Sequence, residues 1–286
     1  MQETIKDWAA WLSLKKSRCT IKGYMWELGK LSAVHPTKQA SDFRLRDLTH
    51  YLAERRFNGC GDASIKRSVA AFKSFFGWVS GKKKSVAASL DFPTVHSRKQ
   101  RSLTVDRLGQ VLASCETSKV IGKRDAALIA LGVDTRLRAS ELCRLRVVDV
   151  DLESRRLHCV IKGGKESERI FSDETRAMVS AWLSVRVAVP DCDRVFVGVG
   201  GNLKGQGMTP DGLRGVFRAI GKRAGIGAFS PHDLCRSFAM ITTARGAPSR
   251  VVQVGGGWSS LKLVEVYTRS LELEAIEKYL PMSGMM

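Results

Sequence analysis

Apolar residues recur at helical spacing through the first 80 residues of the chain. The segment IKDWAAWLS is apolar at positions 5, 8, 9 and 12, and the segment ASIKRSVAAFKSFFGWV is apolar at 65, 69, 72, 75, 76 and 79. This periodicity predicts amphipathic helices over both segments. Further helices are predicted over 20–32 and 45–56, with Thr20 as a plausible N-cap, because its hydroxyl suits a first-turn amide. The N-terminal region is therefore predicted to be helical.

After residue 102 helical and strand patterns are mixed. Helices are predicted over 103–115 and over 122–135, the latter nearly all apolar and hence buried. Residues 147–172 alternate like strands, with Gly163-Gly164 marking a hairpin turn. Helical patterns return over 140–145, 173–187, 209–224, 231–245, 248–255, 260–268 and 271–280. The predicted fold class is mainly α with a small antiparallel β-sheet (α+β).

A basic stretch separates the two regions. It contains GKKKS (81–85), Pro93 and SRKQRS (97–102), a composition typical of a linker between domains. We therefore predict an N-terminal helical domain over 1–92, a basic linker over 93–101 and a second domain over 102–286.

The charge points to a polyanionic partner. Lys and Arg number 47 against 28 Asp and Glu, a net charge of +19, and residues 1–100 hold 19 basic and 8 acidic residues. Nucleic acid is favoured over an anionic membrane, because no basic amphipathic helix or lipidation motif is present. The predicted DNA-contacting residues lie on the helix over 63–79 and in the run after it; the alternative is a solvated charged face. They are Lys66, Arg67, Lys73, Lys82, Lys83 and Lys84.

Other classes are disfavoured. Seven scattered cysteines without a CxxC pair argue against a disulfide framework and a structural zinc site. No apolar run reaches the 18 residues or so of a membrane helix, and no signal-peptide pattern is present. We expect a cytoplasmic, nucleoid-associated protein without a cofactor.

The second region carries residues suited to phosphodiester chemistry. Arg138 lies in TRLRASEL (135–142), and Lys162 follows 24 residues later in IKGGKE. His232 lies in SPHDLCRSF (230–238), and Trp258 and Tyr267 follow at +26 and +9. Arg can neutralise a phosphorane, Lys or His can protonate a leaving oxygen, and Tyr can be a nucleophile. No cluster of acidic residues suggests metal binding, which disfavours a two-metal nuclease.

These motifs, in this order, resemble the catalytic domain of tyrosine recombinases, the integrase and Xer-like family. The resemblance covers about residues 102–270, and the basic N-terminal region resembles the family's core-binding domain. It implies that Arg138 is the first phosphate-clamping arginine and that Glu141 is the acid that supports the active site from the following helix. It further implies Lys162 as leaving-group acid, with Lys165 as second choice. His232, Trp258 and Tyr267 match the second-box histidine, the His/Trp position and the nucleophile.

Two positions depart from the family pattern. The second box usually reads His-x-x-Arg, but Cys235 stands at the arginine position and Arg236 follows it. Three interpretations stay open: a variant that binds DNA but cleaves poorly, Arg236 reaching in through a local distortion, or tolerance of Cys235 because Arg138 and Lys162 carry enough charge. The first is favoured, because a lost transition-state donor costs about 10²–10³ in rate, and a one-residue shift turns Arg236 by about 100°.

The second departure is Arg136, where the family usually has Gly. At positive φ, Arg136 would carry strain of about 1 kcal/mol or more; alternatively, it adds a phosphate contact.

The resemblance implies a C-shaped DNA clamp that recombines DNA at specific sites through a 3′-phosphotyrosine, without metal or ATP. It also implies a double-stranded core site with inverted repeats and a homotetramer on two sites. The C-terminal helix over 271–280 would dock on a neighbouring subunit, or else pack on its own domain. The alternatives are a catalytically weak or inactive DNA-binding homologue and, less favoured, a type IB topoisomerase.

Overall fold

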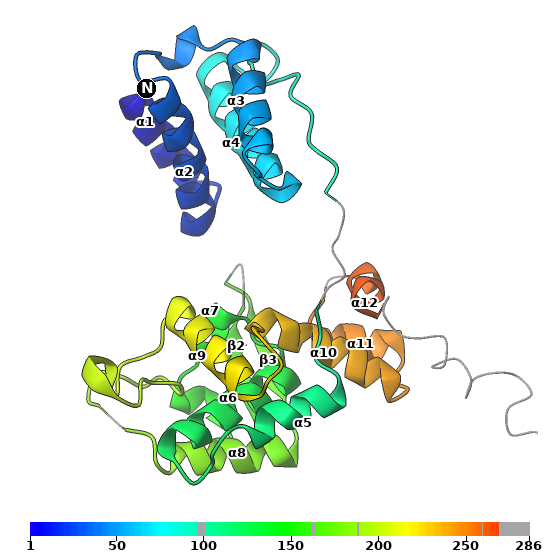
Figure 1. Ribbon diagram of the computed structural model, residues 1–286. Helices are drawn as coiled ribbons and strands as arrows, with labels where there is room; N and C mark the ends of the chain where they lie inside the picture. Colours follow the sequence, from blue (N-terminus) through cyan, green and yellow to red (C-terminus); the bar gives the residue numbers. More distant parts are fainter. Residues whose placement is uncertain (96–100, 162–163, 188, 259, 269–286) are drawn as a thin grey trace, which may run out of the picture. The chain divides into compact units, whose positions relative to one another are not determined.

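The chain folds into two compact units, Met1–Arg98 and Lys99–Met286. The computed structural model describes residues 1–95, 101–161, 164–187, 189–258 and 260–268, and only the backbone at 263 and 266–268. The dividing point falls within the predicted linker over 93–101. The described strands all belong to the second unit, whereas both units contain helices (Figure 1).

The first unit is helical, as its periodicity predicted. Its elements are α1 (Gln2–Ser13), α2 (Arg18–Val34), a short 3₁₀ turn (Ala40–Asp42), α3 (Leu45–Phe57) and α4 (Asp62–Ser80). The predicted N-cap of the second helix was wrong. Ser17 is the cap, and its side chain accepts a hydrogen bond from the backbone N–H of Thr20, which lies inside α2. The N-cap of α2 therefore lies three residues earlier than the sequence suggested.

An aromatic core and one buried ion pair hold this unit together. Trp8 and Phe75 are fully buried with ring centroids 5.6 Å apart in an edge-to-face arrangement. Glu27 is also fully buried, and it accepts hydrogen bonds from Arg55, Arg67 and Ser68. A buried carboxylate requires such partners, because an unpaired charge in the core is costly. Glu27 thereby ties α2 to α3 and α4.

The second unit combines helices with a small sheet. Strands β1 (Val150–Asp151), β2 (Arg156–Val160) and β3 (Glu166–Ile170) form an antiparallel sheet in the order β1-β2-β3. The pair Val160↔Glu166 closes the β2–β3 hairpin at the predicted turn, where Gly164 has φ +78°. The helices are α5 (Val105–Ala113), α6 (Val120–Thr135), α7 (Ala139–Leu142), α8 (Asp173–Leu183), α9 (Pro210–Arg223), α10 (Pro231–Ala244), α11 (Ser249–Gly256) and α12 (Leu261–Thr268).

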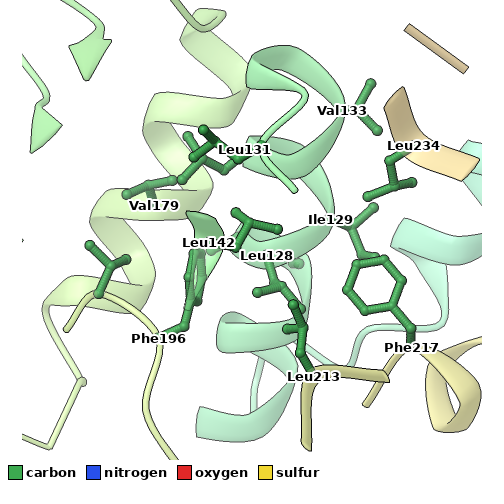
Figure 2. Close-up of a cluster of buried hydrophobic side chains, with 14 of the residues drawn as sticks. Leu128, Ile129, Leu131, Val133, Leu142, Val179, Phe196, Leu213, Phe217 and Leu234 are labelled. Carbon is green, nitrogen blue, oxygen red and sulfur yellow. The ribbon is translucent and has the colours of Figure 1, made fainter. Parts of the chain in front are cut away.

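Helix α6 is the centre of the second core. Its apolar side chains meet residues from α7, α8, α9 and α10 (Figure 2). Close packing against α10 depends on Gly132, because a Cβ there would lie 2.8 Å from Leu234 Cδ1. The end of α6 is therefore held directly beside the first turns of α10.

Helices α10, α11 and α12 share a smaller cluster. Ala239, Val252 and Val264 are buried together, and Phe238 and Trp258 pack against them. The first residues of the second unit also contact α10. The backbone N–H of Leu103 donates to Ser237 Oγ at 2.7 Å, which anchors this segment to the helix. Helix α10 is thus fixed on several sides.

The predicted fold class is confirmed: the described residues are mostly helical with one small antiparallel sheet. Two element predictions need comment. The helix predicted over 173–187 ends at Leu183, and the helix predicted over 271–280 lies outside the described residues. No helix among the described residues is long and apolar enough to cross a membrane.

Candidate active site

Arg138 is positioned by the short link between α6 and α7. It is the N-cap residue of α7, and Glu141 lies in the first turn of that helix. The Glu141 carboxylate accepts the backbone N–H of Arg138 at 2.8 Å with Oε2 and an N–H of its guanidinium at 3.0 Å with Oε1. Glu141 is buried, while the Arg138 side chain remains 58% exposed. One carboxylate therefore caps the helix and aims a guanidinium that still has N–H groups to donate.

His232 lies in the first turn of α10, near Arg138. Asp233 closes a capping box at this turn by accepting the backbone N–H of Ser230 at 2.8 Å. Desolvation lowers the pKa of the His232 imidazole, and the positive charges of Arg236 and Arg138 lower it further. The imidazole is therefore neutral at neutral pH and can donate one hydrogen bond. The charge of Arg138, at the start of α7, therefore acts on His232, in the first turn of α10.

Cys235 faces the end of α6 and carries no charge. It is 7% exposed, and its Sγ donates to the backbone oxygen of Arg136 at 3.1 Å. Burial raises the pKa of this thiol to about 11, so it is protonated at neutral pH. The position at which the family carries its second arginine therefore holds a neutral group.

Arg236 is engaged on its own helix. Its NH1 donates to Asp233 Oδ1 at 3.2 Å, an i,i+3 pair in the first turns of α10. The positive charge of Arg236 lowers the pKa of the His232 imidazole. Asp233 thus holds Arg236 beside His232, and the role of Arg236 stays a prediction.

Trp258 follows α11 and lies against α10. Gly257 ends α11 in the left-handed conformation at φ +60°, and the backbone N–H of Trp258 donates to Gln253 O at 3.1 Å. The indole ring lies 6.5 Å from the Phe238 ring, centroid to centroid. Phe238 is one helical turn beyond Cys235, so Trp258 borders the same face of α10.

The remaining predicted site residues are described in part. Tyr267 belongs to α12, which packs against α10 and α11, but its side chain lies outside the described residues, as does Lys162. Lys165 is exposed at the β2–β3 turn, and its backbone oxygen accepts the N–H of Ile161 at 2.8 Å.

Two further arginines lie beside these residues. The guanidinium of Arg136 lies 4.1 Å from the centroid of the Phe238 ring. Arg169, on β3, lies so close to Gly257 that a Cβ there would be 2.5 Å from its NH2 group. Arg136 stood out in the sequence as an unusual residue at a glycine position, whereas no sequence pattern indicated Arg169. Its place depends on the packing of β3 against the end of α11.

The predicted DNA-contacting residues all lie in the first unit. Lys66 and the run Lys82, Lys83 and Lys84 are exposed. Arg67 donates to Glu27 Oε1 at 2.9 Å, and Lys73 donates to Ala88 O at 2.7 Å. Arg67 and Lys73 therefore also have structural contacts.

The chain is similar to known recombinases over almost its whole length. Residues 101–274 match the model of the phage integrase family. Tyrosine recombinase XerC of Corynebacterium efficiens is 30% identical over 290 aligned positions, which cover 98% of this chain and 90% of that protein.

Two solved structures show the same fold. XerH site-specific recombinase, in a post-cleavage complex with palindromic difH substrate, gives a TM-score of 0.71 at 21% identity and covers 91% of this chain and 78% of that chain. A lambda integrase dimer bound to a COC′ core site gives 0.73 at 15% identity and covers 95% and 97%. The family match and the full-length relative decide the assignment: the chain belongs to the phage integrase family of tyrosine recombinases.

Proposed function

We propose that this chain is a site-specific DNA recombinase that cleaves and rejoins duplex DNA through a 3′-phosphotyrosine intermediate. The observation that carries the proposal is the Arg138 guanidinium, which the buried Glu141 holds at 3.0 Å and whose charge acts on the His232 imidazole of α10. A fixed guanidinium beside a neutral imidazole suits a phosphodiester, because both can donate to its non-bridging oxygens.

In the proposed reaction, Tyr267 attacks the scissile phosphorus. The bond from the tyrosine oxygen to phosphorus forms as the bond from phosphorus to the 5′ oxygen breaks, and Lys162 protonates that leaving oxygen, with Lys165 as second choice. Arg138 and His232 hold the non-bridging oxygens, and Trp258 assists them. Attack of a 5′-hydroxyl from a partner duplex reverses these steps and releases the tyrosine.

The proposal extends to domains and partners. Residues 1–92 would bind DNA through Lys66, Arg67, Lys73 and the run 82–84, residues 93–101 would be the linker, and residues 102–286 would carry the chemistry. The partner would be a duplex core site with inverted repeats, as DNA complexes of similar folds support. Four subunits would join two such sites through the C-terminal segment.

A nicked suicide substrate tests the chemistry. A duplex selected from random sequence by binding to the protein would carry a nick next to the cleavage position, so that the leaving strand diffuses away and the covalent adduct accumulates. We expect an adduct with the wild-type protein and none with Tyr267→Phe. Tyr24→Phe in the first unit is the matched control and should still form it. No adduct with the wild type at saturating protein would refute the proposal.

One observation favours a second candidate, a DNA-binding homologue without useful catalysis. The buried, neutral Cys235 leaves the second-arginine position without charge. This candidate predicts tight binding of the selected duplex without an adduct, so the same experiment separates the two.

A further inference from the structure

Arg136 has a backbone conformation that favours glycine. It is the C-cap of α6, with φ 55° and ψ 25°, and its N–H donates to Gly132 O at 3.1 Å. A side chain in this left-handed region costs about 1 kcal/mol or more. Arg155 also has a positive φ, 56°, but it lies exposed in the β1–β2 turn, where it pairs with Asp173. The side chain of the strained Arg136 lies instead against α10 and α11.

The side chain of Arg136 lies over the face of α10 that carries Cys235. Its guanidinium stands over the Phe238 ring, one helical turn from Cys235, while the Cys235 thiol contacts its backbone oxygen. A Cβ on Gly255 of α11 would lie 3.9 Å from its NH1. The guanidinium therefore occupies the space beside position 235, between α10 and α11.

This guanidinium has no carboxylate partner within 4.0 Å among the described residues. The nearby Asp134 carboxylate accepts the backbone N–H of Ser172 and the hydroxyl of Thr175 instead, and only the Asp134 backbone oxygen accepts from Arg136 NH1, at 2.9 Å. The Nε of Arg136 is buried without a hydrogen-bond partner in the same part of the chain.

A second cation lies near this guanidinium. Burial lowers the pKa of Arg136 to about 10, and the charge of Arg169 lowers it further, although the Asp134 carboxylate acts in the opposite direction. Arg136 still carries its charge at neutral pH. The Phe238 ring and the Asp134 backbone oxygen satisfy this guanidinium only in part, and a bound anion would stabilise a partly buried cation beside a second one.

We propose that Arg136 donates to the scissile phosphate in place of the second arginine that Cys235 lacks. The charge is delivered from the end of α6 rather than from α10. The inference rests on the proposed recombinase chemistry. With Arg136 in this role, the neutral Cys235 at the second-arginine position would no longer imply a weakened site.

An arginine exchange between the two positions tests this. Arg136→Gly should lower the rate of adduct formation about 10²–10³-fold, as expected for one lost transition-state donor. It should not lower the melting temperature, because Gly relieves the strain at positive φ. The double variant Arg136→Gly/Cys235→Arg should recover most of the rate. Cys235→Arg alone should give no gain, because two guanidinium groups would compete for one place.

The matched control is Arg155→Gly, which removes an arginine from the same backbone conformation outside the site and should keep the wild-type rate. Retention of the wild-type rate in Arg136→Gly would overturn the inference. The inference would also be overturned if the double variant Arg136→Gly/Cys235→Arg did not recover the rate lost in Arg136→Gly. Arg136 would then act through something other than its charge beside position 235.

Inorganic phosphate gives a readout that does not depend on cleavage. At a phosphate concentration tenfold above its dissociation constant, the melting temperature of the wild-type chain should rise by about 3–6 °C relative to chloride of equal ionic strength. In Arg136→Gly only the general effect of phosphate on stability should remain, and the additional rise in melting temperature should be absent. The additional rise should return in the double variant. An equal rise in the wild type and Arg136→Gly, or no rise in the wild type, would overturn the inference even if no DNA adduct forms.

Discussion

Glu141 offers a quantitative test of how the site is positioned. Replacement of Glu141 by Gln keeps the size of the side chain, but the amide has only one oxygen for the two donors of Arg138. If that oxygen keeps the helix cap, the bond to the guanidinium is lost. Because the Arg138 side chain is 58% exposed, this loss should cost no more than about 1 kcal/mol of folding stability.

The effect on catalysis should be larger. A guanidinium without its orienting carboxylate can shift by about 1 Å, and such a misplacement costs about 10²-fold in rate. A hundredfold loss corresponds to about 2.7 kcal/mol of activation free energy. The loss in the barrier should therefore exceed the loss in stability.

The chain contains a matched control for Glu141. Arg146 and Asp149 repeat the arrangement: Asp149 accepts the backbone N–H of Arg146 at 3.0 Å and its guanidinium NH2 at 2.8 Å. The Arg146 side chain is similarly exposed, at 51%. Asp149→Asn should cost a similar stability and leave the cleavage rate unchanged.

Single-turnover cleavage of the suicide substrate at saturating protein gives the rate, and thermal unfolding gives the stability. The reasoning is refuted if Glu141→Gln and Asp149→Asn cleave at the same rate. It is refuted as well if the loss in barrier for Glu141→Gln is no larger than its loss in stability.

Two further predictions concern buried groups outside this contact. Glu27→Gln should destabilise the first unit by about 3–5 kcal/mol, since Arg55 would keep a buried charge, whereas the exposed Asp62→Asn should cost about 1 kcal/mol or less. Burial raises the pKa of Glu27, but its hydrogen-bond donors hold it below the ordinary value. Its contribution is therefore present at neutral pH and is lost as the pH falls through the lowered pKa of Glu27; hydrogen exchange of α2 and α4 measures both effects, and unchanged protection in Glu27→Gln would contradict them. Cys235, with a pKa of about 11, should react with iodoacetamide at pH 8 far more slowly than the exposed Cys19, and peptide mass mapping showing equal rates would contradict its buried placement.

Periodicity predicted most elements because burial imposes it. The stripe at 65, 69, 72, 75 and 76 belongs to α4, and all five residues are buried in the core of the first unit. The cap of α2 was missed for a local reason. Ser17 and Thr20 are both suitable hydroxyl residues three positions apart, and only the backbone geometry shows that Ser17 accepts from the N–H of Thr20.

The site was predictable where motif order carried it. Arg138 and His232 were expected in one site; the structure packs the end of α6 on α10 at Gly132, and the charge of Arg138 lowers the pKa of His232, while their joint role stays a prediction. The position of the Arg136 guanidinium was not predictable. It depends on the left-handed end of α6, the aromatic ring one turn along α10 and the approach of α11, which are tertiary contacts between segments about 100 residues apart.

The two departures from the family pattern therefore have to be weighed together. Taken alone, Cys235 removes a positive charge from the site and Arg136 adds backbone strain. Since the Arg136 guanidinium lies beside Cys235, the number of positive charges around position 235 is the same as with Gly and Arg at these two places. A phosphate responds to the position and geometry of its hydrogen-bond donors, and the helix that supplies them is immaterial. In the proposed role of Arg136, strain at φ 55° is the cost of delivering the charge from α6, and on that proposal we expect the chain to cleave DNA.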